Sequence, residues 1–199
     1  MKKLLFIPLA ATLALTSCGG GEDAIEELQH EAEMVAEDGA NDIFEYNDAL
    51  LSEVTLIEVE FAKIYDLDEQ DIPADEFASE VEKSLKVVAD VRKNLSNIDA
   101  YGAGGEGFLQ AVKDYAAESK IVMELYLDYS DLLAIPDVDW SDDELNDFID
   151  VFEPAENAHG DAYDNISTQQ DVFASMNGTS VEEDAAFDAQ EIYDESKEK

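Results

Sequence analysis

Apolar residues recur at alternating steps of three and four along most of the chain, a spacing that places them on one face of an α-helix. Four stretches follow this pattern, over residues 43–64, 77–98, 108–133 and 145–173. A β-strand would alternate apolar and polar residues with a period of two, and the sequence contains no such run. The pattern therefore predicts four long helices that pack along their apolar faces.

Start and stop signals bound these stretches. Asn41 is suited to cap the first helix, and Pro73 to begin the second. Ser141 and Glu144 have the spacing of a capping box for the fourth. Asn177-Gly178 is a typical helix end. The connections between the helices are about seven residues each, over 67–73, 99–105 and 134–140.

Connections this short favour antiparallel neighbours. We therefore predict an all-α fold in which residues 41–178 form an up-down-up-down four-helix bundle. Pro154 removes a backbone donor and clashes with the preceding turn. We expect a kinked fourth helix, bent near residues 150–154, or a short helix over 142–152 followed by a longer one.

Charge dominates the composition. The 199 residues include 50 acidic and 11 basic side chains, for a formal net charge of −39. Such a surface repels a phosphate backbone, which excludes nucleic-acid binding, and a single cysteine cannot close a disulfide or build a zinc cage. Residues 18–40 and 179–199 are rich in acids, so we expect an acidic tether and an acidic disordered tail. Within the tether, residues 24–37 are able to form a short helix.

The first eighteen residues have the layout of an export signal. Lys2 and Lys3 precede an apolar run, Leu4–Leu15, that is too short to span a bilayer and is typical of a signal peptide. The run ends in Leu15-Thr16-Ser17-Cys18, which resembles the lipobox of bacterial lipoproteins. The resemblance implies that residues 1–17 are a lipoprotein signal peptide and that Cys18 carries a diacylglycerol and a further acyl chain. The alternative is an ordinary cleaved signal peptide with a cysteine by chance.

Two further resemblances concern location and fold. Gly19 stands where an aspartate would favour the inner membrane, and Gly19–Gly21 followed by Glu22-Asp23 resembles the tethers of exported surface lipoproteins. Both imply the outer membrane, with the body facing the cell surface or the periplasm. Tyr46-Asn47-Asp48-Ala49-Leu50 resembles all-helical bacterial surface lipoproteins, a likeness that implies a helical body and transfers no activity.

Both histidines follow a glutamate by three residues, in Glu27-Leu28-Gln29-His30 and Glu156-Asn157-Ala158-His159. On a helix such residues share a face, and paired motifs of this kind supply ligands to di-iron bundles. However, Asn47, Ser84 and Ser119 stand where the other carboxylate ligands are needed. We therefore expect no metal and no cofactor.

Glu156 and His159 are nevertheless candidate site residues. The fourth apolar pattern turns both inward, where together with nearby tyrosines they would line a small polar pocket. The alternatives are local pairing, or a rotated helix in which Ala155, Ala158 and Ala162 face the core.

The acidic loops 66–71 and 137–144 lack the glycine and glutamate of a calcium-binding EF-hand, so we expect only weak Ca²⁺ or Mg²⁺ association. No nucleophile elbow occurs, and the glycine-rich segment 102–107 lacks the lysine of a phosphate-binding loop. The sequence thus predicts a lipid-anchored cell-envelope protein, a non-catalytic binding or spacer module whose one assigned partner is membrane lipid through Cys18. The alternatives are a helical bundle that binds a metal or divalent cation, and an enzyme with a small polar pocket around His159.

Repulsion among so many carboxylates predicts that salt stabilises the fold. We expect the melting temperature, followed by circular dichroism, to rise with NaCl and more steeply with Mg²⁺. An unchanged melting temperature between roughly 10 mM and 500 mM salt, a range that spans strong to weak screening, would contradict this prediction.

Overall fold

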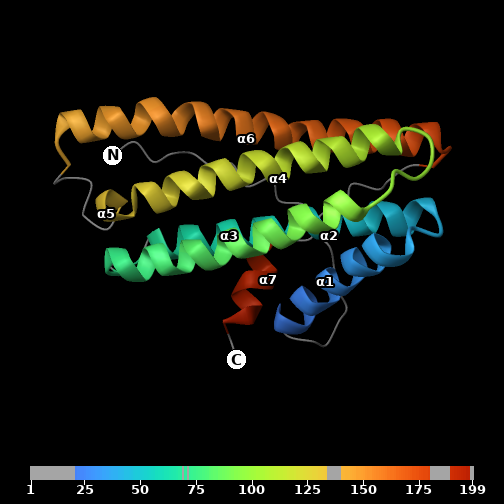
Figure 1. The fold of residues 1–199 in the computed structure, drawn as a ribbon, viewed down its shortest axis with the longest axis horizontal. Coiled ribbons are helices and arrows are strands. Elements are labelled where there is room, and N and C mark those ends of the chain that lie inside the picture. The colour runs from blue at the N-terminus through green and yellow to red at the C-terminus, as the bar shows by residue number, and fades with distance from the viewer. Residues whose placement is uncertain (1–20, 69, 71, 134–139, 180–188, 198–199) are drawn as a thin grey trace.

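The computed structural model describes residues 21–68, 70, 72–133, 140–179 and 189–197, and within these ranges the chain forms helices and no strand. The helices are α1 (Gly21–Asp38), α2 (Ile43–Asp68), α3 (Ala74–Asn97), α4 (Gly105–Asp128), α5 (Ser130–Leu133), α6 (Asp142–Met176) and α7 (Ala189–Ser196). The predicted all-α fold is therefore confirmed. The four long helices α2, α3, α4 and α6 alternate in direction along the bundle (Figure 1).

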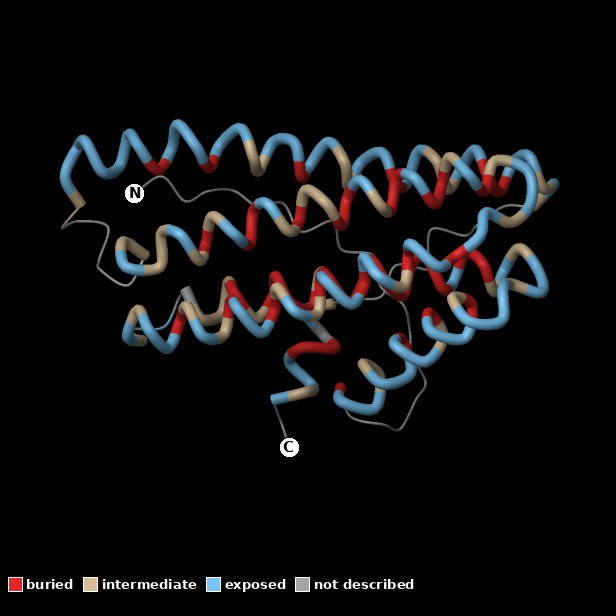
Figure 2. The backbone as a smooth tube through the Cα atoms, in the orientation of Figure 1, coloured by how far each residue is buried: buried red, intermediate tan, exposed pale blue. Residues whose placement is uncertain are grey.

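The helices are arranged around α2 and α3. Figure 1 shows α4 and α6 on one side of these two helices, and α1 and α7 on the other. The apolar faces predicted for the first three long helices are buried almost throughout; their fully enclosed members include Leu50, Ile57, Ile64, Val81, Val88, Leu95, Phe108 and Val112. Helix α6 buries one stripe and exposes the rest of its surface (Figure 2).

The buried stripe of α6 differs from the predicted one at its start. Leu145 and Ile149 are exposed, and Phe148 is buried in their place. Phe148 stacks on Phe152 with ring centroids 4.6 Å apart and meets Trp140 edge-on at 5.4 Å. Because an aromatic ring buries more apolar surface than an aliphatic side chain, this cluster determines the rotation of the first turns.

Helix α6 is continuous through Pro154, so the predicted break into two helices is wrong. Pro154 and Asp150, whose carbonyl loses its helical donor, both lie on the exposed side. Water is able to replace the missing hydrogen bond there, which makes the proline tolerable. A kink within the continuous helix stays a prediction.

The cap predictions hold with one change. Ser141 and Glu144 form the expected capping box, since the Ser141 side chain accepts from the Glu144 amide at 3.2 Å and the Glu144 carboxylate accepts from the Ser141 amide at 2.9 Å. At α2 the cap is Asp42 rather than Asn41, because the Asp42 carboxylate accepts from the amides of the next turn, at 2.9 and 3.0 Å. Gly178 ends α6 with a φ of 72°, the left-handed conformation favoured by glycine.

The expected tether and disordered tail are corrected in their described parts, because residues 21–38 and 189–196 are helical. Residues 24–37 lie in α1, which confirms the alternative of a helix there, and Leu28, Ala32 and Val35 are buried against the bundle. The tail contributes α7, whose Ile192 is 3% exposed. Three apolar residues spaced by three and four are enough to dock a helix even when its other faces are acidic. Residues 18–20 and 180–188 lie outside the described residues.

Close packing of α1 on α7 depends on a glycine. A Cβ atom at Gly21 would lie 2.2 Å from the Ile192 carbonyl oxygen and 2.5 Å from the Ser196 amide nitrogen. Both are backbone atoms that cannot move aside, so a larger residue would separate the helices. The start of α1 and the last turn of α7 therefore meet at one place.

Truncation of Ile192 tests whether α7 is docked. We expect Ile192→Ala to lower the free energy of unfolding by about 2–4 kcal/mol, because it leaves a cavity under a buried side chain. Ile149→Ala is the matched control, since Ile149 is 41% exposed and its truncation should change stability by less than about 0.5 kcal/mol. Urea unfolding measures both, and equal effects of the two substitutions would contradict the docked helix.

Candidate functional site

A buried polar cluster surrounds His159 on α6. Its Nε2 atom lies 3.1 Å from the Ser119 hydroxyl of α4. The imidazole packs between the rings of Phe61, at 4.8 Å between centroids, and Tyr115, at 4.9 Å. The side chain is 7% exposed, so His159 lies inside the bundle, among α2, α4 and α6.

The hydrogen bonds of Ser119 fix the role of the imidazole. The Ser119 hydroxyl donates its proton to the Tyr115 carbonyl oxygen at 2.8 Å. It is therefore an acceptor toward His159, whose Nε2 carries a hydrogen and donates. Burial lowers the pKa of His159 to about 4, so the ring is neutral at pH 7. In this arrangement the Ser119 hydroxyl and the imidazole satisfy each other's hydrogen bonding inside the bundle.

A carboxylate of α2 completes the cluster. The Tyr115 hydroxyl donates to Glu58, and Tyr163 meets the Tyr115 ring edge-on at 5.4 Å. Burial raises the pKa of Glu58 to about 7 and that of Tyr163 to about 12. Half-buried Glu156 also has a raised pKa, from burial and from its neighbour Glu153. Near neutral pH the cluster therefore holds one exchangeable proton, at Glu58.

The polar residues that the fourth apolar pattern turned inward lie in different surroundings. His159 lies at the cluster around Tyr115, whereas Glu156 is half-buried and its charge acts on Tyr65 of α2. The Gln170 amide donates to the Asn47 side chain at 2.8 Å and so joins α6 to α2. Binding of a ligand at Glu156 and His159 stays a prediction.

Two further carboxyl groups of α2 lie inside the protein. Glu60 is 5% exposed, accepts from the Ser84 hydroxyl at 2.7 Å and pairs with Lys63 at 2.5 Å. Glu53 is fully enclosed, and neither of its carboxylate oxygens has a hydrogen-bond partner. Burial raises the pKa of Glu53 to about 8. The nearby Asn94 side chain acts in the opposite direction and lowers this pKa, but it forms no hydrogen bond of standard geometry with the carboxyl group. Glu53 is therefore protonated at pH 7.

The metal-site motifs are not brought together. Glu27 and His30 are exposed on α1, which lies on the other side of α2 and α3 from α6 (Figure 1). In the part of the chain that the structure describes, no group of three or more His, Cys, Asp and Glu side chains is arranged to hold a metal ion. The acidic residues 137–139 and Cys18 lie outside the described residues.

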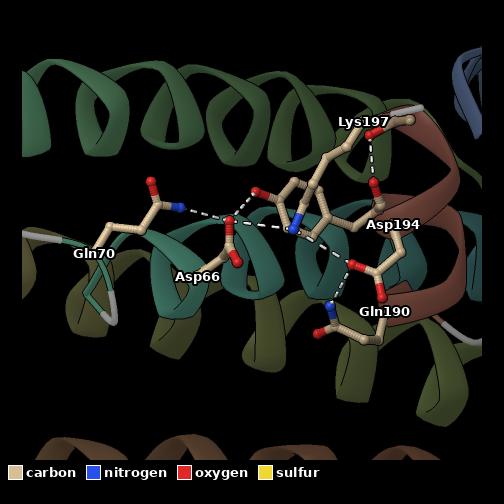
Figure 3. Close-up of polar contacts among 7 residues, drawn as sticks. Asp66, Gln70, Gln190, Asp194 and Lys197 are labelled. Atoms are coloured by element: carbon tan, nitrogen blue, oxygen red, sulfur yellow. Dashed lines mark hydrogen bonds and ion pairs between the residues drawn. The ribbon is translucent and has the colours of Figure 1, made fainter. Parts of the chain in front are cut away.

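Asp66, which the sequence analysis assigned to an acidic loop, lies in the last turn of α2 and has a structural role (Figure 3). Its carboxylate accepts from the Tyr193 hydroxyl at 3.0 Å and from the Gln70 amide at 2.9 Å, and it pairs with Lys197 at 3.1 Å. Lys197 also lies over the Tyr193 ring, 3.9 Å from its centroid. These contacts join the end of α2 to α7.

Glu53 and Glu58 are absent from the sequence prediction because only one face of α2 was assigned to the core. Apolar residues off that face carry a signal: Leu51, Leu56 and Val59 leave α2 with no continuous polar side. A helix that is apolar all round is buried all round.

Comparisons of the chain with protein-family models, with curated proteins and with solved structures find no match.

The raised pKa values predict the pH dependence of stability. Glu53 and Glu58 retain their protons to higher pH in the folded state than in the unfolded chain, where the ordinary value is 4.5. The free energy of unfolding therefore falls as pH rises from about 5 to 8. His159 acts oppositely, but only below its ordinary pKa of 6.5. Glu53 alone should remove about 2 kcal/mol between about pH 6 and pH 8.

Glu53→Gln tests this effect, because the amide stays neutral at every pH. We expect the variant to be more stable than wild type at pH 8 and to lose less stability between pH 6 and pH 8. Glu82→Gln, at an exposed position of α3, removes the same charge and should keep the wild-type pH dependence. Urea unfolding at several pH values measures the slopes, and equal slopes in the two variants would rule out Glu53 as the source.

Proposed function

We propose that this chain is a lipid-anchored protein of the bacterial cell envelope, held at the outer membrane through acylated Cys18, and that its helical bundle acts as a non-catalytic binding or spacing module. The observation that carries the proposal is the position of Cys18, the single cysteine, at the end of a segment that resembles a lipobox and directly before α1. Within the described residues, no helix has the length and apolar character needed to cross a membrane.

The bundle would lie close to this anchor. Two residues separate Cys18 from Gly21, the first residue of α1. Three extended Cα–Cα steps reach about 11 Å at most. Because α1 packs on the bundle, with Leu28 and Val35 buried, the folded body itself would be held at the membrane. The last turn of α7, which touches Gly21, would lie at the same end.

Charge supports a role outside the lipid. Removal of residues 1–17 takes away Lys2 and Lys3, leaving 9 basic and 50 acidic residues and a net charge of −41. Such a body is repelled by anionic headgroups, so it would lie outside the lipid while the short connection to Cys18 keeps it near the surface.

Acylation is tested by expressing the full chain in a Gram-negative host with a palmitate analogue. We expect the mature protein to begin at Cys18, to incorporate the label and to fractionate with the outer membrane. Cys18→Ser should abolish labelling, because the thioether cannot form. Ser17→Ala is the matched control, since it keeps a small residue before the cysteine and should be labelled like wild type. A mature amino terminus without lipid, found by mass spectrometry, would contradict the proposal.

A further inference from the structure

A cavity of about 330 Å³ lies between α3 and α4 and is lined by Arg92, Leu95, Ser96 and Lys113. Two of these four side chains are cationic and none is acidic. Its volume is at the lower end of the range for small-molecule sites. In a chain with 50 acidic residues, a cavity with only positive charge in its wall is unexpected.

The two cations lack carboxylate partners. Among the described residues, neither Arg92 nor Lys113 has a carboxylate oxygen within ion-pair distance, 4.0 Å, whereas Lys63, Lys83 and Lys120 each do. Lys86 and Lys93 of α3 are likewise unpaired among the described residues, so the unpaired cations gather on α3 and α4. Two unpaired cations at one cavity leave a local excess of positive charge.

The sequence around Arg92 is locally basic, although only Arg92 of these basic residues lines the cavity. Residues 83–93 contain four basic side chains and a single acidic one, Asp90, within a chain of net charge −39. Arg92, Leu95 and Ser96 lie on adjacent turns of α3 and face Lys113 of α4 across the cavity. The packing of α3 on α4 therefore brings together cations from two helices.

We propose that this cavity binds the phosphate group of a small anionic ligand. Arg92 offers a planar fork of donors, and Lys113 a compact charge; together they suit the multiple oxygens and charge of a phosphate better than a single carboxylate. Leu95, which is fully enclosed, forms the floor beneath these two side chains. The Ser96 hydroxyl donates to the Lys93 carbonyl at 2.6 Å, so recognition depends on the two cations.

The acidic surface around the cavity determines how phosphate binding should depend on salt. The rest of the surface repels anions, so binding requires both cations and weakens when added salt screens them. The experiment uses the full-length chain in a non-ionic detergent, titrated calorimetrically at pH 7 and fixed ionic strength. The probes are inorganic phosphate and glycerol 3-phosphate, with acetate as the carboxylate comparison.

We expect saturable one-to-one binding of both phosphate probes and at least tenfold weaker binding of acetate. Arg92→Gln and Lys113→Gln should each weaken phosphate binding at least tenfold. Lys93→Gln is the matched control, because it removes the same charge from the next residue of α3, outside the cavity wall, and should change affinity less than twofold. Melting temperatures check that each variant is folded, and Arg92→Lys, which keeps the charge without the fork, should lie between wild type and Arg92→Gln.

Three results would overturn the proposal. They are the absence of saturable phosphate binding, equal affinity for acetate, and equal weakening by Lys93→Gln and Arg92→Gln. The last would assign the effect to general electrostatics. None of these outcomes bears on acylation of Cys18, so the cavity and the lipid anchor are tested independently.

Discussion

Burial of α2 on almost every side is the constraint on which the rest of the structure depends. Residues 49–57 are all buried, a run of nine consecutive positions. A helix with one solvent-facing side buries a stripe, never nine residues in succession. The bundle partners α3, α4 and α6 therefore do not suffice, and α1 and α7 are needed to cover the remaining side of α2 (Figures 1 and 2). Helices at the two ends of the described chain thus belong to the core.

Continuous burial also takes polar groups into the interior, and each is accommodated differently. Thr55 donates to the Leu51 carbonyl at 3.0 Å, within its own helix, and Ser52 donates to Glu31 of α1 at 3.1 Å. Glu58 accepts from Tyr115. Glu53 has no partner, and it is tolerated because a protonated carboxyl is far less costly to bury than a carboxylate. Because α2 is buried on almost every side, the core contains titratable carboxyl groups, and its stability depends on pH.

The apolar faces of α2, α3 and α4 could be predicted from the sequence, since six or more positions repeat with one period. The docking of α1 and α7 could not, because three apolar residues among many acids are a weak pattern until the uncovered side of α2 is known. The start of α6 was ambiguous for a related reason: Leu145, Phe148 and Ile149 are all apolar, and ring packing chooses among them. His159 could be assigned to the interior by periodicity, whereas Glu53 and Glu58 lie off the predicted face. The cationic cavity depends on a pairing of α3 with α4 that spacing alone cannot specify.

Helix α1 lies next to the proposed lipid anchor and also covers one side of α2. If Cys18 is acylated, the lipid is attached within a few residues of the helix that covers one side of α2. That helix supplies Glu31 to Ser52, and the charge of Glu33 contributes to the raised pKa of Glu53. A flexible tether would isolate the bundle from events at the membrane. A displacement of α1 would admit water to Glu53, lower its pKa and release a proton, so the packing of α1 and the protonation of Glu53 are coupled.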